Sequence, residues 1–298
     1  MRVFKTIICI LLAVIVFAGV FSGTAMLAAN SVLSSDPIKL AEIIADEDYD
    51  AMMLSSVRAE VDRAKLLLSL DDEVFDNSVS DADISEAAHK ILAAVISRIL
   101  ENNGAPLPEF ESDKLLDAIT ENINSYAEAH DLIVEEGSAA EVYDYIRLRV
   151  TDQMRIASES YINKIPDLSR VKSLLSMWYL PLIAAIVCAA LIFVIRRREA
   201  VRALNTVTIP VYSAAFFGYV ISRIFSIKDY LSKVSLDESM LREFLIRFYR
   251  ITFGSFEKCF GIALAVALVL LACDIAFVSK FGYATRKNVQ KSGVSDKV

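Results

Sequence analysis

Four long apolar stretches interrupt an otherwise polar chain of 298 residues. They cover residues 6–29, 178–195, 207–224 and 260–278. Each comes close to the roughly 20 residues that a helix needs to cross the hydrocarbon core of a bilayer. The third stretch is the most polar, because it contains Thr208, Pro210 and Ser213. The pattern predicts four transmembrane helices.

Between the first two stretches, apolar residues recur at the three- and four-residue spacing of amphipathic helices. Capping and proline signals divide this region into helices over 37–70 with a break near 46–50, then about 81–103, 112–136 and 138–165. Asp36-Pro37 marks the first start, and Ser138 and Glu141 have the spacing of a capping box. Apolar stripes, such as Leu115, Ile119 and Tyr126 on the third helix, predict burial against neighbouring helices.

The predicted fold is all-α, an integral membrane protein with about four transmembrane helices and an exported four-helix-bundle-like domain. Its expected divisions are 1–29 (signal anchor and first span), 30–175 (extracytoplasmic acidic domain), 176–224 (transmembrane hairpin), 225–258 (extracytoplasmic amphipathic segment), 259–279 (fourth span) and 280–298 (cytoplasmic basic tail). Two alternatives stay open. The first stretch is an anchor or a cleaved signal peptide, and the 225–258 segment lies on the outer leaflet or packs beneath the exported domain.

Charge is sorted around these elements. Residues 30–175 carry 13 Lys and Arg against 30 Asp and Glu, whereas the rest carries 18 against 8. Basic residues follow the second and fourth spans: Arg196, Arg197, Arg198, Arg202, Lys280, Arg286 and Lys287. Because basic loops stay in the cytoplasm, we expect a cell-membrane protein with both termini cytoplasmic and residues 30–175 outside.

The composition also limits the class of protein. Mean hydropathy is +0.46 and 55% of the residues are hydrophobic, more than a soluble protein usually has. None of the four cysteines lies in residues 30–175, and no N-x-[ST] sequon occurs. Both features favour a bacterial protein. An exported acidic domain excludes nucleic acid as a partner.

Three residues in the apolar stretches are candidates for a role beyond spanning the bilayer. Asp274 is an ionisable residue inside the fourth span, which indicates a polar intramembrane site, for coupling or transport or for structural pairing. Gly19 and Gly23 form a GxxxG motif, which favours close helix packing within the chain or, alternatively, homo-oligomerisation.

Metal and cofactor sites are not predicted. Glu86 and His89 share a helix face, as in di-iron bundles, but a second such motif is missing. The carboxylates of residues 46–50 alternate as in a calcium loop, but the glycine and final glutamate of an EF-hand are absent. No signature of an enzyme is present, so no catalytic residue is assigned.

The sequence therefore favours a non-catalytic role in recognition, sensing or assembly, with a protein partner for the exported domain and the bilayer around the spans. The predicted order is one span, an exported domain and then three spans. This layout resembles that of ABC permeases of the FtsX/MacB type. This likeness lies in topology alone, with the short segment 196–204 as the inward link. It implies, as the alternative, a membrane subunit of a transport system. A membrane-embedded enzyme acting through Asp274 is a third hypothesis.

Overall fold

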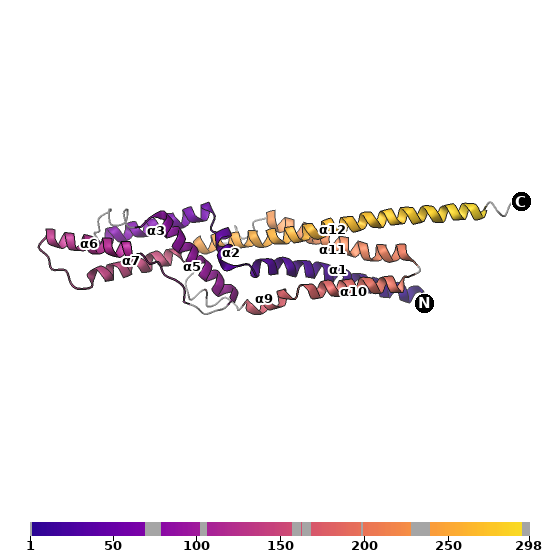
Figure 1. The fold of residues 1–298 in the computed structure, drawn as a ribbon, viewed down its shortest axis with the longest axis horizontal. Helices are drawn as coiled ribbons and strands as arrows, with labels where there is room; N and C mark the ends of the chain where they lie inside the picture. Colours follow the sequence, from indigo (N-terminus) through magenta and orange to yellow (C-terminus); the bar gives the residue numbers. More distant parts are fainter. Residues whose placement is uncertain are drawn as a thin grey trace. The chain divides into compact units, whose positions relative to one another are not determined.

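A computed structural model of the chain describes residues 2–68, 79–101, 106–156, 162, 168–197, 199–227 and 239–293. For residues 2, 68, 239 and 281–293 it describes the backbone alone. The described residues form ten helices and no strand, which confirms the predicted all-α fold (Figure 1). The helices are α1 (Arg2–Leu33), α2 (Pro37–Ile44), α3 (Glu47–Leu68), α5 (Asp81–Glu101), α6 (Asp113–Ala129), α7 (Ser138–Met154), α9 (Ser169–Ser176), α10 (Tyr179–Ile195), α11 (Ala200–Ile227) and α12 (Ser239–Gly293).

Four helical segments are long and apolar enough to cross a membrane, as the hydrophobic pattern predicted. They are Val3–Leu33, Ser169–Ile195, Ala200–Ile227 and Met240–Lys280. The third includes Pro210 inside α11 and still runs for 28 residues. The chain is therefore a membrane protein by the length and composition of its helices.

The chain divides into two compact units. The first, which we call the membrane unit, comprises Met1–Ser34, Lys172–Tyr230 and Tyr249–Val298. The second, which we call the acidic unit, comprises Ser35–Val171 and Leu231–Phe248. Helix α12 contributes residues to both.

Helices of the membrane unit pack through branched aliphatic, small and aromatic side chains. Val16 of α1, Ile192 of α10 and Ala203 of α11 form one buried cluster. Helix α12 lies antiparallel to α11, since Phe225 stacks on Phe253 at 5.1 Å while Gly218, one to two turns earlier, contacts Phe260. These contacts bring all four candidate spans into one unit.

The acidic unit has a core of large aliphatic residues. Predicted stripe positions are fully buried on three helices, with Ile91 of α5, Ile119 of α6 and Ile146 of α7 at most 1% exposed. The predicted break near 46–50 is confirmed, because α2 ends at Ile44 and α3 begins at Glu47. Asp36 caps α2 as expected, with its carboxylate accepting from the Ile38 N–H.

The prediction that the third helix reaches residue 136 is wrong. Helix α6 ends at Ala129, and Asp131 adopts a left-handed φ of 55°. The Leu132 N–H then donates to the Ala127 carbonyl at 2.9 Å, as in a Schellman stop. Tyr126, in the last turn of α6, is 57% exposed and stacks on His130 instead of joining the core.

The fourth predicted helix starts at Ser138 as expected, but its N-cap and its end differ from the prediction. Gly137, with a φ of 97°, is the N-cap residue of α7, and the Ser138 hydroxyl donates to the Glu135 carbonyl. Ser138 is therefore the first residue of α7 and not its N-cap, so the expected capping box is absent. Helix α7 ends at Met154 because Arg155 is extended, and Pro166 lies outside the described residues.

The expected separation of a 225–258 segment from the fourth span is not seen. Residues 239–258 belong to α12, which continues without interruption to Gly293. No proline breaks this stretch and Gly254 is accommodated within it, so the helix has no local reason to end.

Candidate functional site

Asp274 is the ionisable group that the sequence singled out within a span. Its side chain is 4% exposed, whereas Cys273 and Ile275 on either side are exposed. The carboxyl group therefore lies on the face of α12 that packs within the membrane unit. Burial of an ionisable group in a span requires a polar partner.

That partner is Asn205 of α11. An asparagine amide is oriented by its hydrogen-bonding partners, and with Nδ2 toward Asp274 it lies 2.6 Å from Oδ2 and 2.9 Å from Oδ1. Sequence reasoning missed Asn205. The sequence did hold a usable signal. Asn205 follows Arg202 by three residues and Asp274 precedes Lys280 by six, so both lie close to the basic ends of their spans and at a similar depth in the membrane.

Asn205 also lines a groove of about 350 Å³ in the membrane unit. Ile10, Val14 and Phe17 of α1 form one wall, and Pro210 belongs to the other. The amide thus lies between a buried carboxyl group and an open, mostly apolar groove. Its nitrogen donates to a carboxylate and its oxygen accepts from a protonated carboxyl, so the pair is chemically able to hold or release a proton.

The predicted glycine motif packs within the chain. A Cβ added to Gly19 would lie 2.9 Å from the Ala185 Cβ, and one added to Gly23 would lie 2.6 Å from the Leu182 Cγ. Both glycines are buried. The absence of a side chain at these positions therefore permits the close approach of α1 and α10.

The predicted topology-determining residues are only partly brought together. Arg196, Arg197 and Arg202 line one cavity, while Lys280 is exposed on α12. Arg198 lies outside the described residues, and the side chains of Arg286 and Lys287 lie outside the description too.

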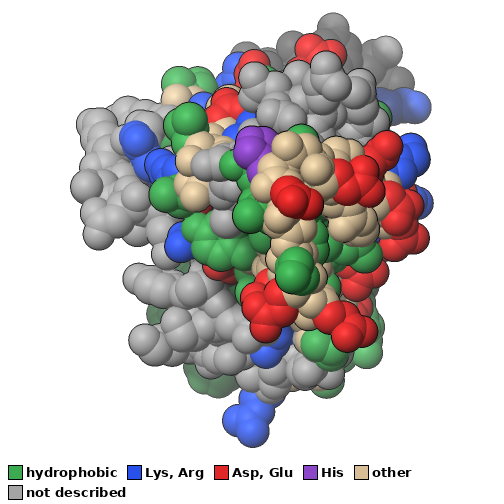
Figure 2. All heavy atoms as spheres, turned by 90° about the vertical axis from the view of Figure 1, so that its left-hand side faces the viewer, with side chains coloured by type: hydrophobic (Ala, Val, Ile, Leu, Met, Phe, Trp, Pro, Cys, Tyr) green, Lys and Arg blue, Asp and Glu red, His purple; other side chains and the backbone are tan. Residues whose placement is uncertain are grey.

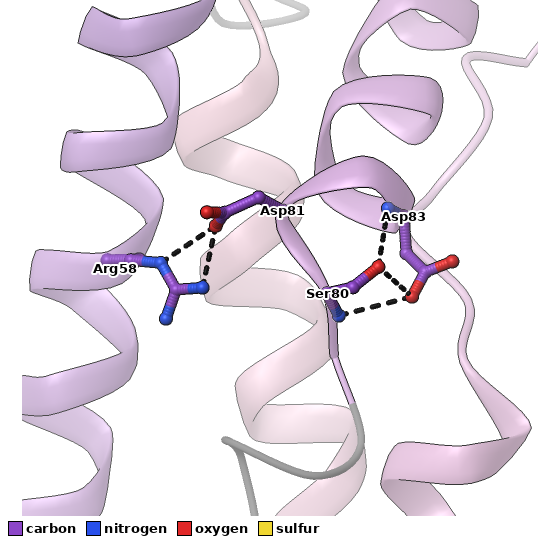
Figure 3. A network of polar contacts seen from close by, with 4 residues as sticks. All are labelled: Arg58, Ser80, Asp81 and Asp83. Atoms are coloured by element: carbon purple, nitrogen blue, oxygen red, sulfur yellow. Dashed lines mark hydrogen bonds and ion pairs between the residues drawn. The ribbon is translucent and has the colours of Figure 1, made fainter.

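In the acidic unit, polar side chains link helices or cap them (Figure 3). Arg58 Nε and Nη2 of α3 both donate to Asp81 Oδ1, at 2.9 and 2.6 Å. Before α5, the Asp83 N–H donates to Ser80 Oγ while the Ser80 N–H donates to Asp83 Oδ2. Hydrogen bonds from Ser80 hold the pKa of Asp83 below its ordinary value. These contacts have a structural role.

The residues weighed as metal ligands have other partners. His89 Nε2 lies 2.9 Å from Asp50 Oδ1, and Glu86 pairs with Lys90 at 2.7 Å. Within the described ranges, no group of three or more His, Cys, Asp or Glu side chains is placed to hold a metal ion.

Asp46 caps α3 and pairs with a residue of α12. Its carboxylate accepts from the Tyr49 N–H at 3.0 Å and from Arg247. Burial opposes ionisation, but these hydrogen bonds and the Arg247 charge outweigh it and lower the pKa of Asp46. Tyr49, 2% exposed beneath the Arg247 guanidinium, has its pKa raised by burial.

An exposed apolar tip joins α6 to α7. Leu132, Ile133 and Val134 are 57%, 100% and 36% exposed, and Asp131, Glu135 and Glu136 beside them are exposed carboxylates. Figure 2 views the molecule from the side of α6 in Figure 1, where Asp and Glu side chains gather on the right of the face among exposed hydrophobic ones. We call residues 131–136 the α6–α7 tip.

No protein-family model matches the chain, and searches of curated proteins and of solved structures found no match.

Proposed function

We propose that the chain is a multi-pass cell-membrane protein whose acidic unit lies outside the cell and acts in recognition or assembly by contacting a protein partner. The role is non-catalytic. The observation that carries the proposal is the α6–α7 tip, where three adjacent apolar side chains are exposed and surrounded by carboxylates. Adjacent exposed apolar residues on a polar surface are typical of contact sites.

The orientation rests on the cations of the membrane unit. Lys5 from the start of α1 and Arg196 and Arg197 from the end of α10 line the same cavity. These helix ends therefore lie on one side of the unit. Since clustered Lys and Arg are retained in the cytoplasm, this supports cytoplasmic termini and an exported acidic unit.

The chemistry of the tip defines the partner. A complementary surface has an apolar groove for Ile133 and basic residues at its rim for Asp131 and Glu135. Such a contact weakens as salt increases, because its rim charges are screened.

The test is photo-crosslinking in intact cells, with a photoreactive amino acid at Leu132 of the full chain. We expect a discrete crosslinked protein whose yield falls about 30-fold in Ile133→Asp, the effect of losing a central contact of about 2 kcal/mol. The matched control is Leu66→Asp, since Leu66 is 83% exposed on α3, away in sequence from the tip. Equal yields for the wild type and Ile133→Asp would refute the proposal.

A membrane subunit of a transport system is the second candidate. The Asn205–Asp274 contact favours it, because a buried carboxyl in a span is typical of coupling sites. This candidate predicts an ATPase subunit that co-purifies with the chain and transport that is lost in Asp274→Asn at normal expression. The recognition proposal predicts that Asp274→Asn leaves crosslinking at the tip within about twofold, as for other changes distant from a contact.

A further inference from the structure

Three helix ends meet around a cavity of about 480 Å³ in the membrane unit. Its lining comes from the start of α1, the end of α10 and the start of α11, and includes Lys5, Ile195, Arg196, Arg197, Glu199 and Arg202. We call it the basic cavity.

Among the described residues that line the basic cavity, positive charge exceeds negative charge. Glu199, its one acidic lining residue, pairs with Arg202 Nη1 at 3.1 Å. In the part of the chain that the structure describes, Lys5, Arg196 and Arg197 form no ion pair with a carboxylate. Among the described residues, three cations thus face one cavity without an ion-pair partner of their own, an arrangement that favours a bound anion.

The depth of the cavity indicates which anion it meets. Lys5 lies two residues before Ile7, near the start of the apolar run of α1. Arg196 directly follows Ile195, the last residue of the apolar run of α10. The cations therefore lie where the hydrocarbon-length segments end, which is the level of lipid headgroups. Arginine guanidinium groups bind phosphate oxygens with two parallel hydrogen bonds, and Lys5 adds a compact charge.

We propose that the basic cavity binds the phosphate group of an anionic ligand, supplied by a phospholipid headgroup or by a free phosphate compound. Arg196 and Arg197 hold the phosphate oxygens and Lys5 adds charge from the start of α1. This proposal is independent of the proposed recognition function and of the orientation, because both leaflets present phosphate at this depth.

The test uses the purified full chain in a non-ionic detergent. Native mass spectrometry would count bound dioleoyl phosphatidylglycerol and dioleoyl phosphatidylcholine, and a second arm would add inorganic pyrophosphate as competitor. We expect phosphatidylglycerol to bind at least about tenfold more tightly than phosphatidylcholine, which equals about 1.4 kcal/mol. Displacement by micromolar pyrophosphate would identify a free phosphate compound as the source, and its failure to displace lipid would identify the lipid.

Substitutions of the arginines test whether the lipid phosphate binds in the basic cavity. Arg196→Gln with Arg197→Gln should abolish the lipid preference, while Arg170→Gln with Lys172→Gln removes two cations before the apolar part of the same span and should leave it unchanged. If the glutamine pair does not insert, Arg196→Lys with Arg197→Lys keeps the charge and should still weaken binding about tenfold, because lysine lacks the two-pronged geometry. Equal binding of both lipids, or an unchanged preference in the Arg196 and Arg197 variants, would overturn the proposal.

Discussion

The membrane unit and the acidic unit place opposite kinds of residue on their surfaces. In the membrane unit, small side chains such as Ala203, Ala214 and Gly218 are buried, while Ile186 and Ile262 are both 68% exposed. In the acidic unit, large aliphatic residues such as Ile119 are buried and charged residues are exposed.

This inversion shows that the two units face different solvents. In water, large apolar side chains gain most from burial, whereas among lipid chains they gain nothing from it and small residues instead let helix backbones approach. The acidic unit is therefore stabilised by apolar burial, and the membrane unit by close packing.

The largest effect is expected from removing a core side chain of the acidic unit. Ile119 is fully buried, so Ile119→Ala should lower the free energy of unfolding by about 2–5 kcal/mol. Pulse proteolysis of the full chain in urea, read from cleavage sites in each unit, measures the change. Ile186→Ala, which shortens a lipid-facing side chain of α10, is the control and should stay within about 0.5 kcal/mol. A larger loss from Ile186→Ala would remove the contrast between the units.

Adding a methyl group should damage the membrane unit where helices meet. A Cβ at Gly218 would overlap the Phe260 ring, so Gly218→Ala should cost about 1–3 kcal/mol in unfolding from detergent. Gly254 has no atom within 4 Å of an added Cβ, and Gly254→Ala should be neutral or stabilising by up to about 1 kcal/mol. Combining Gly218→Ala with Phe260→Leu should restore part of the loss, and its failure to do so would contradict the packing of α11 on α12.

A fully buried hydrogen bond in the acidic unit should matter more than a half-buried one. Thr151 is 1% exposed, and its hydroxyl accepts from the Phe110 N–H at 3.0 Å. Thr151→Val leaves that N–H unsatisfied and should cost about 1–3 kcal/mol. Thr120→Val removes only a hydroxyl that donates to the Leu116 carbonyl one turn earlier, and should cost less than Thr151→Val in the same urea titration. Equal costs would show that the Phe110 contact contributes little.

The smallest effect is expected from Asp46 and depends on pH. Its folded-state pKa is lowered, so its contribution to stability is present above the unfolded pKa and is lost as pH falls through the folded pKa. Asp46→Asn should therefore cost up to about 1 kcal/mol at pH 7, the usual limit for a half-exposed ion pair. The difference from wild type should close below about pH 4. A gap that widens in acid would contradict the lowered pKa.

Much of the fold follows from the sequence, because the length of an apolar run and the spacing of a stripe are local properties. The four spans, the break before Glu47 and the buried stripe positions on α5 are examples. The end of α6 was missed because Asp131 occupies the left-handed position that glycine usually holds. The capping box expected at Ser138 is absent because Gly137, in the left-handed region, takes the N-cap position and Ser138 is already helical.

The candidate sites were less predictable, because each depends on which helices are neighbours. Asp274 was evident as a carboxyl within a span, but Asn205 became its partner only through the antiparallel packing of α11 and α12. Arg196 and Arg197 were identified by their charge, whereas their convergence with Lys5 requires the packing of α1 against α10.

The central claim, that water outside the cell surrounds the acidic unit while lipid surrounds the membrane unit, is tested most directly by labelling in intact cells. Single cysteines would replace Ser125, exposed on α6, and Ala200, exposed at the start of α11, in a chain without its four native cysteines. The account predicts that a membrane-impermeant maleimide labels the cysteine at 125 in intact cells and the one at 200 only after permeabilisation. Labelling at 200 but not at 125 in intact cells would contradict it.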